Sequence, residues 1–210
     1  AIFSKIHAIG IDNKKGILNA LGLPGPGVNQ FLKELQYSEL WKFKRPLGIS
    51  IGGDNKDEYI KNIEKIENTI KENQVDYFYE LNISCPNTKN GDTICQSPEI
   101  LESLLLRLRH FLGKVISIKV SPDVSNETLL KIGEVASSFE KIIINAGNTK
   151  YVSPIEVNVD ASNFSMAGGG LSGAPIFTRT LEMVHLFSNF NVPIMATGGI
   201  SDIDLSLIHI

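Results

Sequence analysis

Apolar and polar positions follow two different periods along the chain. Short apolar runs rich in β-branched and aromatic residues predict strands, and longer segments with an apolar residue every three or four positions predict helices. In the segment 56–71, for example, isoleucines at positions 60, 63, 66 and 70 fall on one face of a helix. The two patterns alternate from one end of the chain to the other.

This alternation predicts a parallel α/β fold in one domain covering residues 1–210. The predicted strands are 1–6, 46–51, 75–83, 115–120, 141–145 and 192–197, with a glycine-rich turn region after the first. The predicted helices are 28–35, 56–71, 98–111, 126–137 and 174–190. Parallel neighbours need a crossover helix, and near-continuously apolar strands are expected where both faces of the sheet are covered.

Polar residues at the predicted strand ends distinguish a closed barrel from an open sheet. They occur at 4–5, 52–53, 82–87, 119, 145–149 and 198–199. An open sheet uses mainly one crevice, whereas a barrel gathers all its strand ends around one mouth. No Gly-x-Gly-x-x-Gly follows the first strand, which disfavours a dinucleotide-binding sheet. We therefore favour a closed barrel over an open sheet.

Composition narrows the class of protein. The net charge of −3 argues against a nucleic-acid groove or an anionic membrane surface as the main partner. Two cysteines are too few for a disulfide framework, so we expect a reducing, cytoplasmic compartment. No apolar run approaches the roughly 18 residues that span a bilayer. The four histidines have no spacing that suggests a metal site.

The segment 80–88, Glu-Leu-Asn-Ile-Ser-Cys-Pro-Asn-Thr, carries the strongest candidate chemistry. A predicted strand ends here with Asn82, Cys85 and Asn87 in one turn, as at the mouth of an α/β barrel. The thiol could accept a proton, and the amides could hold a flat heterocycle rich in carbonyl and N–H groups. The alternative is a small buried cysteine with capping asparagines.

Lys119 and two glycine-rich turns suggest a bound flavin nucleotide. Lys119 ends an apolar strand, where its ammonium could meet the N1/O2 edge of a flavin or form a salt bridge with a carboxylate of the mouth. The turns 168–173 and 197–200 could approach a phosphate, because glycine has no Cβ. Asn19, Asn145, Asn148 and Thr149 suit an imide-like substrate, or are turn and cap residues.

Taken together, these residues resemble the dihydroorotate dehydrogenases, flavin-dependent barrel enzymes of pyrimidine biosynthesis. The most specific match is the segment 82–87, Asn-Ile-Ser-Cys-Pro-Asn; the segments 19–24 and 170–173 follow. The resemblance runs from Ala1 to about Asp202. It implies an FMN-binding α/β fold of the TIM (β/α)8 barrel type, incomplete in this chain. A cysteine at position 85 is similar to the soluble class 1 enzymes, whereas the membrane-associated class typically has serine.

The resemblance also implies roles for individual residues. Cys85 would be the base that takes the C5 proton of dihydroorotate while the C6 hydride passes to flavin N5. The implied FMN contacts are Lys5, Asn82, Lys119, Gly147, Gly173, Gly198 and Gly199. The implied orotate contacts are Lys5, Asn19, Leu21, Gly22, Leu23, Asn82, Asn87, Asn148 and Thr149.

The family's first barrel strand would precede Ala1 and its last would follow Ile210. A barrel without these strands has open edges and half a phosphate site, so the flavin chemistry is expected of the full-length protein. The family suggests a homodimer. Fumarate is the first expectation for the electron acceptor, and an NAD-linked form would need an electron-transfer subunit. Quinone is the third alternative, and Cys85 disfavours it.

Two other functions remain open at this point. One is a sibling flavin barrel that oxidises another dihydropyrimidine; its relatives carry iron–sulfur cysteines, which Cys85 and Cys95 alone do not provide. The other is a non-catalytic barrel module that binds a phosphorylated ligand or a protein partner. Such a module would not need Cys85, Lys119 and several amides around one mouth.

Overall fold

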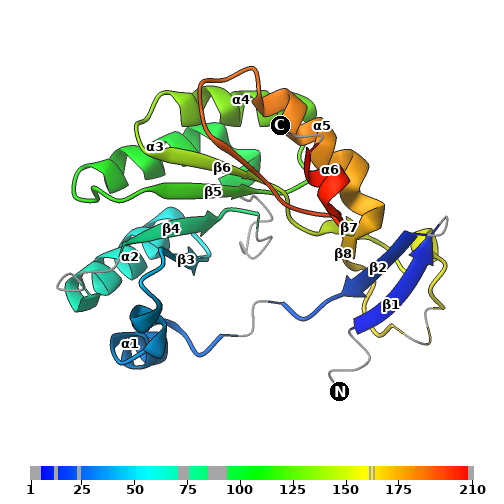
Figure 1. Cartoon of the computed structure of the whole chain (residues 1–210), viewed down its shortest axis with the longest axis horizontal. Helices are drawn as coiled ribbons and strands as arrows, with labels where there is room; N and C mark the ends of the chain where they lie inside the picture. Colours follow the sequence, from blue (N-terminus) through cyan, green and yellow to red (C-terminus); the bar gives the residue numbers. More distant parts are fainter. Residues whose placement is uncertain are drawn as a thin grey trace.

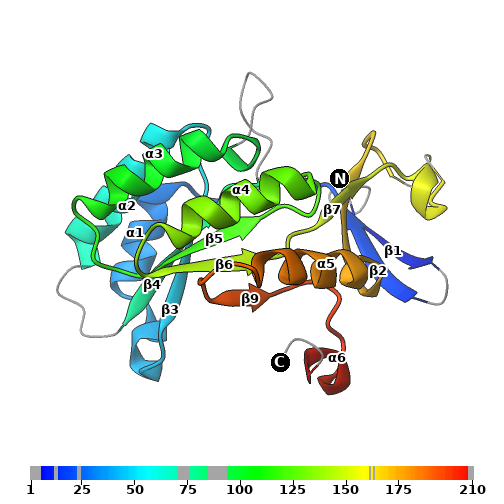
Figure 2. The same cartoon turned by 90° about the horizontal axis from the view of Figure 1, so that it is seen from above.

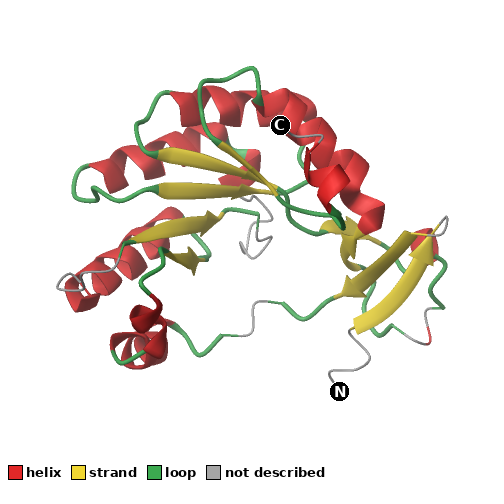
Figure 3. Cartoon of the chain, viewed as in Figure 1, coloured by secondary structure: helices red, strands yellow, loops and turns green. Residues whose placement is uncertain are grey.

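The computed structural model describes residues 6–11, 14–22, 25–70, 76–84, 94–160, 162 and 164–207. These residues form a parallel sheet covered by helices and a smaller antiparallel sheet beside it (Figures 1 and 3). In the described part of the chain the parallel sheet has five strands, in the order β3 (Leu47–Ile51), β4 (Tyr77–Asn82), β5 (Ile116–Val120), β6 (Ile142–Ala146) and β9 (Ile194–Ala196).

Helices arch over one face of the parallel sheet (Figures 1 and 2). They are α1 (Val28–Gln36), α2 (Lys56–Ile70), α3 (Pro98–Arg109), α4 (Asn126–Ser137) and α5 (Phe177–Phe187). The short α6 (Ile203–Leu207) follows β9 and lies apart from this layer (Figure 2). From α1 to α5, each helix packs against the next along the chain. Successive parallel strands with their helices on the outside form part of a (β/α)8 barrel, and the predicted fold class is confirmed.

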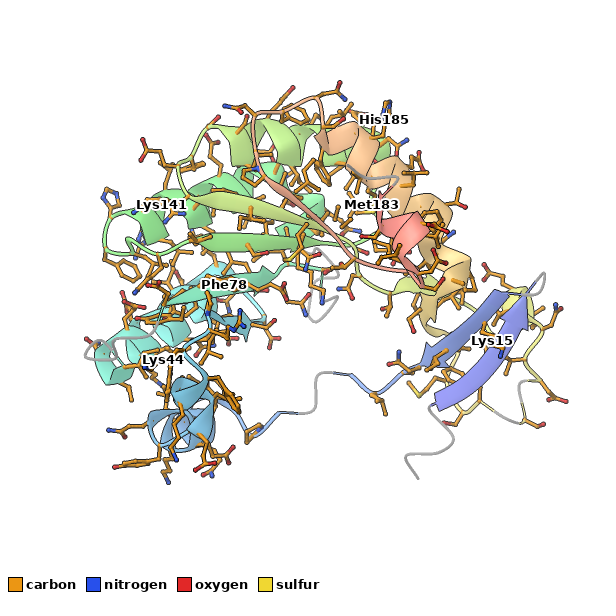
Figure 4. All side chains as sticks on the ribbon, viewed as in Figure 1. Lys15, Lys44, Phe78, Lys141, Met183 and His185 are labelled. Carbon is orange, nitrogen blue, oxygen red and sulfur yellow. The ribbon has the colours of Figure 1, made fainter. Side chains whose placement is uncertain are left out.

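Local sequence explains where two of the helices begin. Pro98 occupies the first turn of α3, where the missing N–H has no helical partner to lose. Ser125 caps α4, since its hydroxyl accepts a hydrogen bond from the backbone N–H of Thr128 at 3.2 Å. The helical side of the sheet then fills with apolar side chains, and Met183 of α5 is completely buried there (Figure 4).

The two faces of β4 differ in burial and polarity. Tyr77, Tyr79 and Leu81 are buried under the helices, whereas Glu80 and Asn82 alternate with them on the other face and are partly exposed. Phe78, labelled in Figure 4, shares the face of Glu80. The expectation of near-continuously apolar strands is therefore wrong for β4, because its face away from the helices carries the polar chemistry.

The antiparallel sheet was not predicted. It has the order β1 (Ile6–Ile11), β2 (Lys14–Asn19), β8 (Gly169–Gly173) and β7 (Lys150–Val152) within the described residues. The glycine-rich turn expected after the first strand is instead the β1–β2 hairpin, and the expected turn at 168–173 is largely β8. A Cβ on Gly16 would lie 2.6 Å from the backbone oxygen of Ser172, so close strand contact requires glycine there.

Other element boundaries differ by a few residues. The predicted helix 174–190 begins as a 3-10 helix, Ala174–Ile176, and its α-helical part ends at Phe187. The predicted strand 192–197 is shortened to β9, and the predicted strand 1–6 lies outside the described residues except for Ile6. None of the helices described is both long enough and apolar enough to cross a membrane.

Candidate active site

Polar side chains meet at the carboxyl ends of the parallel strands. Strand register pairs Asn82 of β4 with Lys119 of β5, and Lys119 with Asn145 of β6, so the three residues lie on one face of the sheet. We call the following set the polar rim: Glu80, Asn82, Ser84, Lys119, Asn145, Gly147, Asn148 and Thr197. It lies on the face away from the helices, where the interior of a barrel would be.

Two predicted substrate-binding asparagines meet directly in this rim. The side-chain amide of Asn148 donates to Oγ of Ser84 at 2.7 Å and to Oδ1 of Asn82 at 3.4 Å. The Ser84 hydroxyl donates to Oδ1 of Asn82 at 2.9 Å and approaches the backbone oxygen of Lys119 at 3.3 Å. The end of β4 is thereby tied to the segment after β6, immediately before Cys85.

Asn19 and Thr149 approach each other through β8. The Asn19 amide donates to the backbone oxygen of Gly170 at 3.3 Å, and a Cβ on Gly170 would lie 2.3 Å from Oγ1 of Thr149. Leu21 and Gly22 follow β2 and are exposed. The antiparallel sheet thus carries one group of predicted substrate residues, and the polar rim carries the other.

Lys119 has a carboxylate partner. Its Nζ lies 3.9 Å from Oε1 of Glu80, and the Lys119 and Glu80 side chains are 29% and 16% exposed. The amide of Asn145 donates to Oε2 of Glu80 at 2.8 Å, while the hydroxyl of Thr197 donates to Oδ1 of Asn145 at 2.7 Å. The salt bridge considered for Lys119 therefore exists, with Glu80 as its acid.

The predicted glycine contacts converge near the start of α5. Gly173 ends β8 and immediately precedes the 3-10 helix that leads into α5. Gly199 has φ +75°, and a Cβ there would lie 2.7 Å from the backbone nitrogen of Phe177. Gly147 lies against the turn that contains Gly198 and Gly199, because a Cβ added at Gly147 would lie 1.6 Å from the backbone oxygen of Thr197. Gly198, between Thr197 and Gly199, lies beside Thr180 of α5.

A cavity of about 740 Å³ opens next to the polar rim. Its walls come from the start of α1, the end of β3 and α2, with Ser50 and Asn82 on its lining. Asn82 therefore faces both the amide cluster and an open volume.

Four predicted site residues, Lys5, Leu23, Cys85 and Asn87, lie outside the described residues. The other cysteine, Cys95, is almost fully buried, and this burial raises the pKa of its thiol to about 12. A thiol with such a pKa is a poor base or nucleophile near neutral pH. Among the described residues, no group of three or more His, Cys, Asp or Glu could hold a metal ion.

Glu80, Ser84 and Thr197 were not among the site residues predicted from the sequence. The pattern Glu80-x-Asn82 contained the information for Glu80, because residues two apart in a strand share a face. Ser84 and Thr197 lie just beyond the ends of β4 and β9, where periodicity gives no direction for a side chain.

A family model described as dihydroorotate dehydrogenase matches residues 10–205. The chain belongs to the dihydroorotate dehydrogenase family. It is 33% identical to the dihydroorotate dehydrogenase B (NAD(+)) catalytic subunit of Pyrococcus furiosus, over 89% of this chain and 59% of that protein. The corresponding subunit of Malacoplasma penetrans is 32% identical over 91% of this chain and 61% of that protein.

A relative from Aquifex aeolicus, 28% identical over 95% of this chain and 64% of that protein, is named for type A, with fumarate. The chain thus spans about three-fifths of the length of the curated relatives it matches. Among solved structures, DHODH of Eimeria tenella in complex with ferulenol matches with a TM-score of 0.64 at 22% identity. This match covers 89% of this chain and 56% of that one, and it shows the shared fold.

Proposed function

We propose that the full-length protein oxidises dihydroorotate to orotate, with FMN as the hydride acceptor. The observation that carries this proposal is the amide cluster of Asn82, Ser84 and Asn148 at the end of β4. It offers donors and acceptors in a fixed arrangement directly before Cys85, as a flat imide substrate requires. Membership of the dihydroorotate dehydrogenase family supports the same reaction.

The described residues fit a flavin nucleotide. Lys119 supplies a cation that suits the N1/O2 edge, which becomes negative when the flavin is reduced. Gly173, Gly198 and Gly199 gather at the start of α5, where backbone can approach a phosphate closely. When bound, the flavin would supply the hydride acceptor. We propose that Lys119 and Asn82 contact the flavin ring and that these glycines contact the phosphate.

The residues of the proposed site have the following tasks. Asn82 and Asn148 orient the pyrimidine, and Ser84 holds both amides in place. Cys85 accepts the C5 proton, and an ordinary thiol pKa near 8.5 predicts activity that rises toward alkaline pH. Lys5, Asn19, Leu21, Gly22, Leu23, Asn87 and Thr149 complete the proposed substrate set.

We propose NAD(+) as the electron acceptor, and the support comes from the relatives rather than from the site. Most of the relatives compared are named as NAD(+)-linked catalytic subunits, which favours NAD over the fumarate expected from the sequence. An NAD-linked enzyme of this type implies a separate electron-transfer subunit. A homodimer and a cytoplasmic location complete the proposal.

Orotate formation by the full-length protein tests the function. Wild type should form orotate from dihydroorotate, and Cys85→Ala should keep its flavin but lose most turnover. Cys95→Ala is the matched control, because its buried thiol has no proposed part in the reaction. Equal turnover in Cys85→Ala and wild type would remove Cys85 from the mechanism. Preference for another dihydropyrimidine would favour the sibling enzyme.

A further inference from the structure

Glu80 occupies the middle of the polar rim and has three partners. Its Oε2 accepts a hydrogen bond from the Asn145 amide at 2.8 Å. Its Oε1 accepts a hydrogen bond from the Ser50 hydroxyl at 3.3 Å and lies 3.9 Å from Nζ of Lys119. These partners come from β3, β5 and β6, so one carboxylate connects four neighbouring strands.

The carboxylate is held in place independently of Lys119. The Asn145 side chain is buried and accepts from the Thr197 hydroxyl at 2.7 Å, which fixes the direction in which its amide donates. Glu80 therefore keeps its position whether or not the lysine contacts it. This arrangement makes Glu80 a fixed negative charge beside the ammonium.

Lys119, in contrast, retains capacity for another partner. Its separation of 3.9 Å from Glu80 is long for a charge-assisted hydrogen bond. Within the described part of the chain, the carboxylate of Glu80 is the partner recorded for its ammonium. An ammonium has three donors, so it can meet a ligand while Glu80 stays nearby.

We propose that Glu80 is a fixed counter-charge that lowers the reduction potential of a flavin bound at Lys119. The inference rests on the function proposed above. Reduction places negative charge on the flavin edge, which Lys119 stabilises and a neighbouring carboxylate opposes. Glu80 thus acts through Lys119 as a positioning residue, and it favours release of electrons from the reduced flavin to the acceptor.

The test compares flavin potentials in the full-length holoprotein. Glu80→Gln keeps the shape of the side chain and an oxygen for Asn145, but removes the charge. We expect this variant to bind reduced flavin, relative to oxidised flavin, about tenfold more tightly than wild type does. For a two-electron couple, this corresponds to a rise of about 30 mV in the reduction potential of the bound flavin. The potential is measured by equilibrium reduction against a reference dye.

Glu127→Gln is the matched control, because Glu127 pairs with Lys131 on the exposed surface of α4. It removes the same charge away from the polar rim and should leave the potential unchanged. Glu80→Asp keeps the charge but shortens the side chain, so it should raise the potential by less than Glu80→Gln. Glu80→Ala also removes the charge, and it decides the question if Glu80→Gln does not fold.

An unchanged or lowered potential in Glu80→Gln overturns the proposal, as does an equal rise in Glu127→Gln. If Glu80→Gln does not fold, an unchanged or lowered potential in Glu80→Ala overturns it. Wild-type protein that binds no flavin overturns the proposed function and this inference together. The inference alone is overturned if the wild-type protein binds flavin and oxidises dihydroorotate but the flavin potential does not change in Glu80→Gln.

Discussion

Replacing Ser84 by alanine should weaken both the fold and the substrate site. The Ser84 hydroxyl donates to Asn82 at 2.9 Å and accepts from Asn148 at 2.7 Å, and all three side chains are partly buried. A neutral hydrogen bond contributes about 1 kcal/mol net, so losing both should lower the free energy of unfolding by about 1–2 kcal/mol. Water can replace part of the loss, because the site is not fully enclosed.

The same substitution should affect orotate more than the flavin. Asn82 and Asn148 would lose the group that fixes their orientation, and the substrate would have to order them on binding. If this ordering costs about 1.4 kcal/mol, the dissociation constant for orotate rises tenfold. Titration of the flavin spectrum with orotate measures this constant, and urea unfolding of the full-length protein measures stability.

Ser137→Ala provides the control for both assays. Its hydroxyl donates to the backbone oxygen of Glu134 at 2.8 Å, at the exposed end of α4. We expect little change in stability and none in orotate affinity. If Ser84→Ala bound orotate as tightly as wild type, the amide cluster would not position the substrate.

Three further predictions address other parts of the molecule. Cys95 should resist alkylation in the native protein while Cys85 reacts; peptide mass spectrometry measures this, and equal labelling would contradict the burial argument. Burial, with hydrogen bonds to a shared glutamate, raises the pKa of Tyr77 and Tyr79 above the ordinary value near 10. The folded state therefore holds these protons more tightly than the unfolded state, so stability should be fully present below about pH 10 and fall above it. Urea midpoints from pH 8 to 11 measure this effect, and no alkaline loss would refute it. Gly199→Ala should weaken flavin binding, because its φ of +75° and the contact with α5 exclude a Cβ; unchanged flavin affinity by fluorescence titration would contradict the proposed phosphate turn.

The parallel part of the fold was predictable because each element carries its own period. Helix α2 buries Ile60, Ile63, Ile66 and Ile70, the residues that the helical pattern had placed on one face. The antiparallel sheet was not predictable in this way. Its strand β8 has the sequence Gly-Gly-Leu-Ser-Gly, so it has few side chains to form a pattern, and pairing with β2 determines its conformation.

The site, like the fold, was predictable only in part from the sequence. Motif and strand position were sufficient to select Asn82, Lys119 and Asn148, which the structure places on one rim. The partner of Lys119 required the register between β4 and β5, because a carboxylate in a neighbouring strand is remote in sequence. Strand period alone places Glu80 on the face of Asn82, but its pairing with Lys119 became identifiable only when the strands were aligned.

The most direct test of the account is anaerobic mixing of the flavin-loaded, full-length protein with dihydroorotate. The loss of oxidised-flavin absorbance reports hydride transfer, and dihydrouracil serves as the comparison substrate. The account predicts rapid bleaching by dihydroorotate, slow bleaching by dihydrouracil, and almost none by dihydroorotate in Cys85→Ala. A flavin that dihydroorotate leaves oxidised in the wild-type protein would contradict the proposed function.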